Sequence, residues 1–420
     1  MPREVALEDL DLSALIRPGE VVAWGQISGE PRTLVEALAA QAPELGGIGA
    51  LIGMSPAPTL APESAESISV RALGGGATNH RLAAPGRLEV VPLRLSDLPH
   101  LIAAGVVRID VALVQVARDD GGDYNLGVSA DYMGEAVAAA RLVIAEANER
   151  MPRTFGDTRV AGAAVDVVVP TSRPLVSPPA RSPGAVERAI AGHVARLVPD
   201  RAVLQTGLGA VPDAVLEGLA GKKDLGVHSG LIGDGVLDLI EAGVITNAAK
   251  EIDAGVTVTA VLYGSERLYR WADRNPALAV RSMRHTHAQE VMAHFRRFVS
   301  INSALEVDLT GQVNAETVGG RHVGQIGGQI DFVRAGVRAP EGRSIIALPS
   351  TARGGKLSRI VPKLADGVVT TARADVDTVV TEHGIAELQG RSLSERARAL
   401  RAIAHPDFRA GLERAAERLV

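Results

Sequence analysis

The chain has 420 residues with 44 basic and 49 acidic side chains, which gives a formal net charge of −5, and only 3% of its residues are aromatic. This composition argues against a nucleic-acid-binding protein, which would need a basic face and aromatic platforms for base stacking. The lack of cysteine in the sequence excludes disulfides, thiolate metal sites and a cysteine nucleophile. Hydrophobic residues make up 46% of the chain, which is enough for large cores, and the length predicts two or three domains.

Residues 1–10 carry acidic side chains where a secretory signal peptide needs an apolar stretch. No run of about 18 uncharged apolar residues occurs in the sequence, so a membrane-spanning helix is not predicted. We therefore expect a soluble, cytoplasmic protein that does not associate with membranes.

Short runs rich in valine, isoleucine and leucine alternate with longer amphipathic stretches in the first 170 residues. Strands are predicted at residues 21–24, 48–52, 88–93, 109–116, 160–165 and 167–169. Helices are predicted at residues 29–40, 95–104 and 130–149, the last of which is rich in alanine. This alternation predicts an α/β fold with mainly parallel sheets.

Residues 170–183 contain five prolines together with several serines and threonines. Such a composition is typical of an extended linker. We place a domain boundary here and expect an N-terminal α/β domain at residues 1–178 and a C-terminal one at residues 179–420. The second domain resumes the pattern, with strands at 202–205, 225–228, 256–262, 344–348 and 376–381 and helices at 183–197, 213–220, 235–242 and 392–420.

A glycine-rich turn at residues 206–212 joins a predicted strand to a predicted helix. Backbone N–H groups of such a turn bind anions at a helix N-terminus. The segment lacks the Gly-Lys-Ser/Thr ending of a P-loop and the third glycine of a dinucleotide fingerprint. Taken alone, it favours an ordinary tight turn.

Two further segments carry polar groups in a suggestive order. Glu306 and Asp308 alternate with apolar residues and are followed by Gln312 and Asn314, so they line either a polar cleft or a solvated strand face. In the segment 324–334 a Gly-Gly pair precedes an amide and an acid. Its backbone donors would suit an oxyanion hole, and a bulge or turn is the rival interpretation.

The ten histidines are scattered along the chain. His285 and His287 lie in a charged, helical region and would face apart, and no His-Glu-x-x-His pattern occurs, so we predict no metal site. The Gly-x-Ser-x-Gly elbow of a serine hydrolase is also missing. The sequence His228-Ser229-Gly230 at the end of a predicted strand is only suggestive of a catalytic site.

Taken together, the chain resembles the acetyl-CoA hydrolase/transferase family, in particular its 4-hydroxybutyrate and butyrate CoA-transferase branch. The resembling segments follow one order along most of the chain: residues 29–31, 124–129, 151–157, 207–212, 234–247, 306–312, 327–332, 358–362, 381–386 and 404–408. The resemblance implies two related α/β domains with mainly parallel sheets and an active site in the cleft between them. It also implies a homodimer, with coenzyme A or acyl-CoA as a substrate and no permanently bound cofactor.

The resemblance further implies covalent chemistry. In such transferases a glutamate attacks the acyl-CoA thioester, the released thiolate attacks the resulting anhydride, and a second carboxylic acid then receives the CoA. The expected partners are therefore acyl-CoA and a small carboxylate or water.

Position by position, the resemblance assigns roles to glycine loops and to two polar or charged side chains. Asn314 would place a side-chain amide near the oxyanion, Gly328 would offer it a backbone N–H, and Lys356 would meet a CoA phosphate. The positions expected to contact CoA are Gly207, Leu208, Gly209, Ala210, Val211, Gly324, Gly327, Gly328 and Lys356.

The family glutamate follows a His-Thr or His-Ser pair, and in this chain that position is Gly230. Glycine has no side chain to acylate, and neither Ser229 nor Leu231 is an acid. The usual double-displacement transfer therefore cannot run through this position.

Three hypotheses follow. The first is an enzyme with altered chemistry, either thioester hydrolysis or direct acyl transfer, in which Asn314 and Gly328 stabilise the oxyanion. The second is a CoA-transferase that uses a relocated acid, with Glu316 or Asp234 as the nearest candidates in sequence. The third is a non-catalytic acyl-CoA-binding protein.

Overall fold

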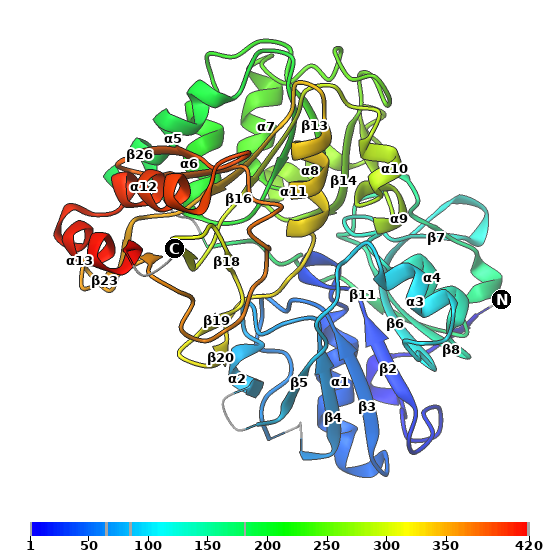
Figure 1. Ribbon diagram of the computed structural model, residues 1–420. Coiled ribbons are helices and arrows are strands. Elements are labelled where there is room, and N and C mark those ends of the chain that lie inside the picture. The colour runs from blue at the N-terminus through cyan, green and yellow to red at the C-terminus, as the bar shows by residue number, and fades with distance from the viewer. Residues whose placement is uncertain (1, 64–65, 84–85, 180–181, 418–420) are drawn as a thin grey trace. The chain divides into compact units, whose positions relative to one another are not determined.

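The computed structural model describes residues 2–63, 66–83, 86–179 and 182–417 (Figure 1). The chain divides into two compact units that interleave in sequence. The first unit comprises Met1–Pro178, Val258–Thr286 and Arg321–Gly327, and the second comprises Pro179–Thr257, His287–Gly320 and Gly328–Val420. The predicted domains were continuous in sequence, whereas two segments of the second half of the chain belong to the first unit.

A parallel sheet organises the first unit, with the strand order β1-β11-β8-β6-β2-β3-β4-β5. Each neighbouring pair along this path is parallel. The strands are β1 (Arg3–Glu4), β2 (Val21–Trp24), β3 (Ile48–Ile52), β4 (Ile68–Ala72), β5 (Leu88–Val90), β6 (Val111–Arg118), β8 (Leu142–Asn148) and β11 (Val167–Thr171). This arrangement confirms the predicted fold class for the first unit.

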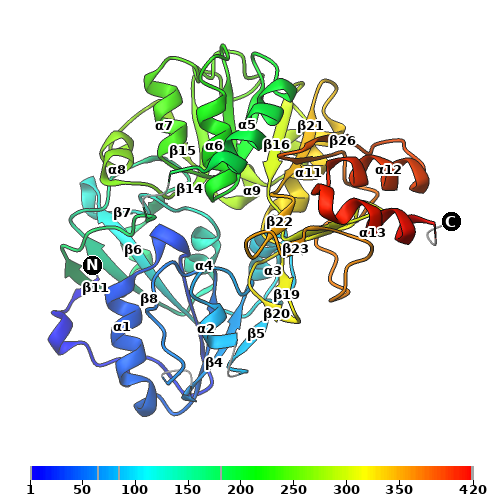
Figure 2. The same cartoon turned by 90° about the vertical axis from the view of Figure 1, so that its left-hand side faces the viewer.

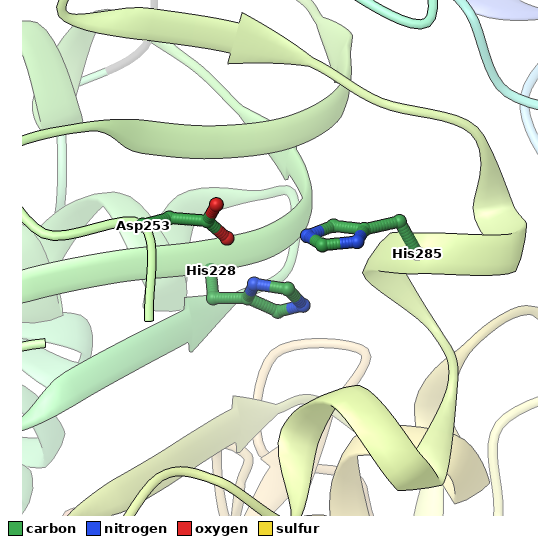
Figure 3. Close-up of side chains that lie close together, drawn as sticks. All are labelled: His228, Asp253 and His285. Carbon is green, nitrogen blue, oxygen red and sulfur yellow. The ribbon is translucent and has the colours of Figure 1, made fainter. Parts of the chain in front are cut away.

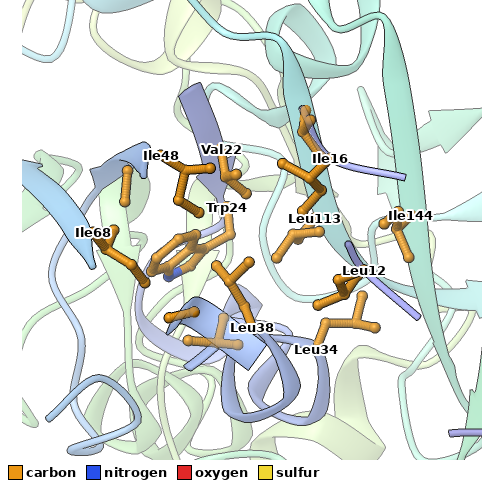
Figure 4. Close-up of a cluster of buried hydrophobic side chains, with 14 of the residues drawn as sticks. Leu12, Ile16, Val22, Trp24, Leu34, Leu38, Ile48, Ile68, Leu113 and Ile144 are labelled. Atoms are coloured by element: carbon orange, nitrogen blue, oxygen red, sulfur yellow. The ribbon is translucent and has the colours of Figure 1, made fainter. Parts of the chain in front are cut away.

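The central strands of this sheet are buried on both faces. Along β6, Val111 and Leu113 join one hydrophobic cluster, and Ala112 and Val114 join another. In the first cluster, Trp24 of β2 packs among Leu34, Leu38 and side chains of the neighbouring strands (Figure 4). Parallel strands that are covered on both faces need long apolar runs, and the central strands β6 and β8 have such runs.

Helices and short strands complete the first unit. Its helices are α1 (Arg32–Gln41), α2 (His80–Ala83), α3 (Leu98–Ala103), α4 (Met133–Ala139), α8 (Glu266–Ala272) and α9 (Met283–Thr286). Its short strands are β7 (Tyr124–Asn125), β9 (Phe155–Gly156), β10 (Arg159–Val160), β15 (Leu278–Val280) and β20 (Arg321–His322). Strand β14 (Thr257–Leu262) begins at the last residue of the second unit's first segment and continues into the first unit.

The predicted helix at residues 130–149 is wrong over its second half. The structure has only α4 there, followed by the strand β8, all seven residues of which are buried. Ile144 contributes to one cluster and Val143 to the other, so β8 is covered on both faces. A strand buried on both faces shows no polar alternation, and hydrophobic periodicity cannot distinguish it from a buried helix.

Six strands of the second unit follow one another in a sheet in the order β26-β25-β21-β16-β12-β13. Its pairings are parallel except that of β25 with β26. The strands are β12 (Val203–Thr206), β13 (Gly226–Ile232), β16 (Phe298–Asn302), β21 (Arg343–Ala347), β25 (Thr378–Thr381) and β26 (Gly384–Glu387). The predicted mainly parallel α/β class is thus confirmed for this unit as well.

The helices of the second unit include α5 and α6, which pack against each other (Figure 2). The full set is α5 (Ala185–Leu197), α6 (Ala210–Gly218), α7 (Asp234–Glu241), α10 (Gln289–Met292), α11 (Gln329–Arg338), α12 (Leu393–Ile403) and α13 (Pro406–Ala416). Instead of the one C-terminal helical segment predicted at 392–420, there are two helices, because Pro406 starts a new one after His405 as its N-cap. Residues 418–420 of that prediction, and 180–181 of the predicted linker, lie outside the described residues.

Short strands lie outside this sheet. They are β17 (Glu306–Asp308), β18 (Val313–Asn314), β19 (Thr317–Val318), β22 (Thr351–Ala352), β23 (Leu357–Ser358) and β24 (Ile360–Val361). Strand β17 pairs with β18 and β24, and β22 pairs with β23. Among the described residues, no helix is both long enough and apolar enough to cross a membrane.

Candidate active site

The glycine-rich turn after β12 leads directly into α6. Gly209 is the N-cap residue of that helix and has a φ of +118°, a conformation that favours glycine. A Cβ at this position would meet nothing within 4 Å, so the constraint is the backbone and not the space. Leu208 is 40% exposed. The turn therefore presents backbone groups at a helix N-terminus, which is compatible with the predicted CoA contacts at residues 207–211.

Gly230 lies inside β13, where the backbone is extended, a conformation that any residue can adopt. The constraint here is the space beside it. A Cβ built on Gly230 would lie 2.9 Å from Nε2 and 3.0 Å from Cε1 of His287, and 3.4 Å from Cε2 of Phe332. The imidazole of His287 therefore occupies the position that a side chain at residue 230 would need.

Gly328 meets the same imidazole from another element. It is the N-cap residue of α11, and a Cβ there would lie 2.5 Å from both Cδ2 and Nε2 of His287. The ring of Phe332, on α11, lies 4.7 Å from the imidazole between centroids. Two glycines that are far apart in sequence thus both leave room for one histidine.

His287 is 2% exposed, and this burial lowers the pKa of its imidazole to about 3. The side chain is therefore neutral at physiological pH. The sequence analysis gave His287 no role. No local pattern marks it, because its partners Gly230 and Gly328 lie on other elements.

Three of the five phenylalanines of the chain gather in this part of the second unit. The ring of Phe298 stacks with those of Phe295 and Phe332. His228, which precedes Ser229 and Gly230 on β13, packs against Phe295 with 5.0 Å between ring centroids. A cluster of aromatic rings therefore packs against His228 of β13.

His228 also approaches an acid of its own unit. A ring nitrogen of His228 and a carboxylate oxygen of Asp253 lie within 4.8 Å of each other (Figure 3). The third side chain in that view, His285, belongs to the first unit. The sequence-based expectation of no metal site stays a prediction.

Asn314, predicted as an oxyanion donor, is fully buried and makes four hydrogen bonds. Its Nδ2 donates to Oε1 of Glu306 at 3.0 Å and to the carbonyl of Thr317 at 2.9 Å. Its Oδ1 accepts from the backbone N–H groups of Glu316 and Thr317. Both donor hydrogens are engaged in this conformation, so an oxyanion would have to replace one of these bonds.

The two acids considered as relocated nucleophiles are placed differently. Glu316 is buried, and its Oε1 accepts a hydrogen bond of 2.7 Å from the hydroxyl of Thr370. Asp234 is the first residue of α7, four positions after Gly230 in sequence. Neither placement by itself gives a nucleophile, and their roles stay predictions.

The sequence left open whether Asp308 lines a polar cleft or a solvated strand face. Its buried carboxylate accepts hydrogen bonds from backbone and side-chain groups of Thr310 and Gln312. This acid ties the turn between β17 and β18 together from the inside. It therefore lies on neither a solvated strand face nor an open polar surface.

The remaining predicted positions are spread over both units. Gly324 and Gly327 belong to the first unit, where their carbonyls accept from the N–H groups of Gly75 and Leu95. Lys356 is exposed in the turn between β22 and β23. Within the second unit, the structure brings Gly230 and Gly328 together around His287.

The first unit contains a cavity of about 880 Å³ near the ends of β6 and β8. Its lining includes four arginines and three acids, so its charges nearly balance: Arg118, Arg150, Arg153, Arg270, Glu149, Glu266 and Asp273. None of the predicted site residues lines it. Its position therefore does not coincide with the glycine-flanked histidine.

Comparison with known proteins decides the family. The model of the acetyl-CoA hydrolase/transferase N-terminal domain matches residues 6–196, and that of the C-terminal domain matches residues 264–416. The chain belongs to the acetyl-CoA hydrolase/transferase family. The family comprises enzymes that act on CoA thioesters, so the resemblance seen in the sequence is confirmed.

Relatives in this family are similar over most of the chain. A 4-hydroxybutyrate coenzyme A transferase of Clostridium kluyveri is 44% identical over 340 residues, which cover 80% of this chain and 79% of that protein. A succinyl-CoA:cyclohexane-1-carboxylate CoA transferase of Geobacter metallireducens is 35% identical and covers 99% of this chain and 96% of its own length. The crystal structure of RipA from Yersinia pestis superposes with a TM-score of 0.93 at 34% identity, covering 99% of this chain and 97% of its own.

Proposed function

We propose that this member of the acetyl-CoA hydrolase/transferase family acts on acyl-CoA thioesters by direct attack of water or of a second acceptor on the thioester. The observation that carries this proposal is the arrangement at Gly230. The position to which the family resemblance assigns the nucleophilic glutamate has no side chain, and the space beside it is filled by the neutral imidazole of His287.

The energetic consequence follows from the missing carboxylate. A transferase holds the thioester energy in a covalent intermediate with its own side chain, so that CoA can be passed to a carboxylic acid. Without that side chain, the acyl group is attacked in one displacement, and water is the acceptor that is always present. Hydrolysis is therefore the first expectation and direct acyl transfer the second.

Two features support binding of the thioester. The turn at 207–211 presents backbone groups at the start of α6, where the phosphates of CoA would be favoured. Gly328, at the start of α11, would provide a backbone N–H to the oxyanion that forms on the thioester carbonyl. Asn314 would join it only by exchanging one of its present hydrogen bonds.

The alternatives are a transferase with a relocated acid and a non-catalytic binder of acyl-CoA. Glu316 is the more buried of the two candidate acids, and its hydrogen bond from Thr370 would have to be displaced before it attacked a thioester. For all three readings we propose a cytoplasmic homodimer with no permanently bound cofactor, as the family resemblance implies.

The test uses the purified protein with acetyl-, propionyl-, butyryl- and succinyl-CoA, and follows free thiol with a chromogenic disulfide. Thiol release that needs no carboxylate supports hydrolysis. Exchange of CoA between acyl groups, detected by chromatography and only in the presence of acetate or succinate, would support the relocated acid. Tight CoA binding by calorimetry without either reaction would support the binder and contradict the proposal.

A further inference from the structure

His287 stands where two missing side chains would meet. Nε2 is its closest atom to the built Cβ of Gly230, and it shares the closest approach to that of Gly328. Approaches under 3.0 Å are essentially unknown for real Cβ atoms, so this ring position requires glycine, or a shifted ring, at both sites. The lack of a side chain at residue 230 and the position of the imidazole nitrogen beside it therefore depend on each other.

The surroundings orient this ring. Phe332 packs on it, and Phe298 stacks on Phe332 in turn. Gly230 and Gly328 are each half-buried, whereas His287 behind them is buried. Nε2 therefore faces the backbone at both glycines, and neither position contributes a side chain in front of it.

Two electrostatic effects act on this nitrogen. Burial keeps the imidazole neutral, which is the form that accepts a proton. An oxyanion that develops beside the ring favours the imidazolium, because an opposite charge nearby favours the charged form. The basicity of the ring therefore rises as the tetrahedral intermediate forms.

We propose that His287 is the general base of thioester hydrolysis in this protein, an inference that rests on the proposed function. Nε2 takes a proton from water as the water oxygen bonds to the thioester carbonyl carbon, and the carbonyl electron pair moves onto oxygen beside the Gly328 N–H. The intermediate then collapses, the carbon–sulfur bond breaks, and His287 returns the proton to the sulfur. The products are a carboxylic acid and CoA thiol, with no oxidant or reductant needed.

The imidazole could instead serve only to fill space. Chemical rescue of an alanine variant distinguishes this packing role from the general-base role. In His287→Ala we expect kcat for acyl-CoA hydrolysis to fall about 100- to 10,000-fold, the range of general acid–base catalysis, while CoA affinity changes little. Added imidazole should restore part of kcat, whereas thiazole, a ring of similar size but much lower basicity, should not. Equal rescue by both rings would overturn the proposal, as would an alanine variant that retains wild-type kcat.

A second variant covers the case in which the alanine variant does not fold. His287→Gln keeps a planar polar group of similar length without a basic nitrogen, and we expect the same loss of kcat. Full activity of the folded glutamine variant, or an acyl group found covalently on His287 by peptide mapping, would overturn the general-base role. His294→Ala is the matched control, because His294 is an exposed histidine a short distance along the chain, and wild-type kcat is expected.

The wild-type enzyme separates this inference from the proposed function. If it releases no thiol from any acyl-CoA, the proposed hydrolysis fails and the general base fails with it. If it hydrolyses acyl-CoA and the His287 variants do so equally well, only the assignment of the base is wrong.

Discussion

At residue 230, steric contact and not backbone conformation explains the glycine. The strand β13 is extended there, so a larger residue would be allowed by φ and ψ, but its Cβ would collide with His287. Asn314 shows the opposite case, since its side chain is held by four hydrogen bonds from its own neighbourhood. Substitutions at these two positions therefore test packing in one case and polar satisfaction in the other.

Gly230→Glu alone should lower the free energy of unfolding by about 1–3 kcal/mol, because it overpacks the space held by His287. In the double variant with His287→Ala the clash is relieved and a carboxylate stands at the family position. We expect the double variant to form a glutamyl-CoA thioester, seen as a mass increase of the intact chain that hydroxylamine removes. Gly230→Ala with His287→Ala is the control without a carboxylate. A folded double variant that binds CoA but never forms the adduct would show that more than the nucleophile has diverged.

Asn314→Ala should destabilise the protein by about 1–3 kcal/mol, because it leaves buried hydrogen-bonding partners unsatisfied. Urea unfolding measures this loss. If Asn314 also binds the oxyanion, kcat in the folded variant should fall by about 10²–10³, as for removal of one oxyanion donor. A stable variant with unchanged kcat would contradict both roles.

At the scale of elements, two glycines of the candidate site lie at the N-termini of helices. The turn from β12 to α6 depends on the positive φ of Gly209, and α11 begins at the glycine that faces His287. In the first unit, the buried carboxyl of Glu30 lies shortly before α1 and accepts hydrogen bonds from the hydroxyls of Ser55 and Thr59. We therefore expect the effect of a substitution at each of these positions to depend on its local geometry.

Gly209→Val should weaken CoA binding while the fold is kept. Its side chain would enter open space, but a β-branched residue at φ +118° is strained, at a cost of about 1–3 kcal/mol. Calorimetry with CoA measures the affinity. Gly221→Val is the matched control, because that glycine also faces open space but has no positive φ, and unchanged affinity is expected. Wild-type affinity in a folded Gly209→Val variant would contradict the placement of CoA at this turn.

Burial raises the pKa of Glu30 to about 7, against hydrogen bonds from Thr59 and Ser55 that lower it. Because the folded-state pKa lies above the unfolded value of 4.5, the protonated group favours the folded state below about pH 4.5, and this contribution is lost as pH rises to about 7. Glu30→Gln mimics the neutral form, so its stability relative to wild type should rise by about 3 kcal/mol between pH 4.5 and 7.5. Chemical denaturation at several pH values measures the difference. The exposed Glu44→Gln should show no such trend, and a flat difference for Glu30→Gln would refute the shift.

At the scale of the whole molecule, the two units are each built from separated parts of the chain. The first unit takes Val258–Thr286 from the second half of the sequence. That segment supplies β15, which pairs with β9, and Asp273, whose carboxylate accepts from the backbone N–H of Arg153. Residues 1–178 of this chain therefore lack some of the contacts that the first unit makes.

A fragment of residues 1–178 should therefore not fold cooperatively, because β9 loses its partner and Asp273 is missing. Near-ultraviolet circular dichroism and urea unfolding should show a broad transition without defined tertiary signals. A fragment in which residues 258–286 are joined to 1–178 by a flexible linker is the control and should be more stable. A sharp, two-state transition of the short fragment would contradict this view of the first unit.

Much of the architecture could be predicted from local signals. The strand predicted at 21–24 is β2, that at 48–52 is β3, and the helix predicted at 29–40 corresponds to α1. These segments have turn or helix-start residues at their ends. Their side-chain patterns can be interpreted without knowing which other elements pack against them. The strand β8 escaped prediction, because an alanine-containing apolar run is decided by the partners that cover it.

The sequence by itself determined the α/β class, the family and the absence of an acid at Gly230, because each is written in the order and identity of neighbouring residues. Only the tertiary structure decided what stands in the place of that acid. His287 reaches Gly230 and Gly328 because the segment after α9, the strand β13 and the start of α11 converge in the second unit. Local propensity acts over a few residues, whereas close packing brings distant ones into contact, and the buried, neutral imidazole is a product of that packing.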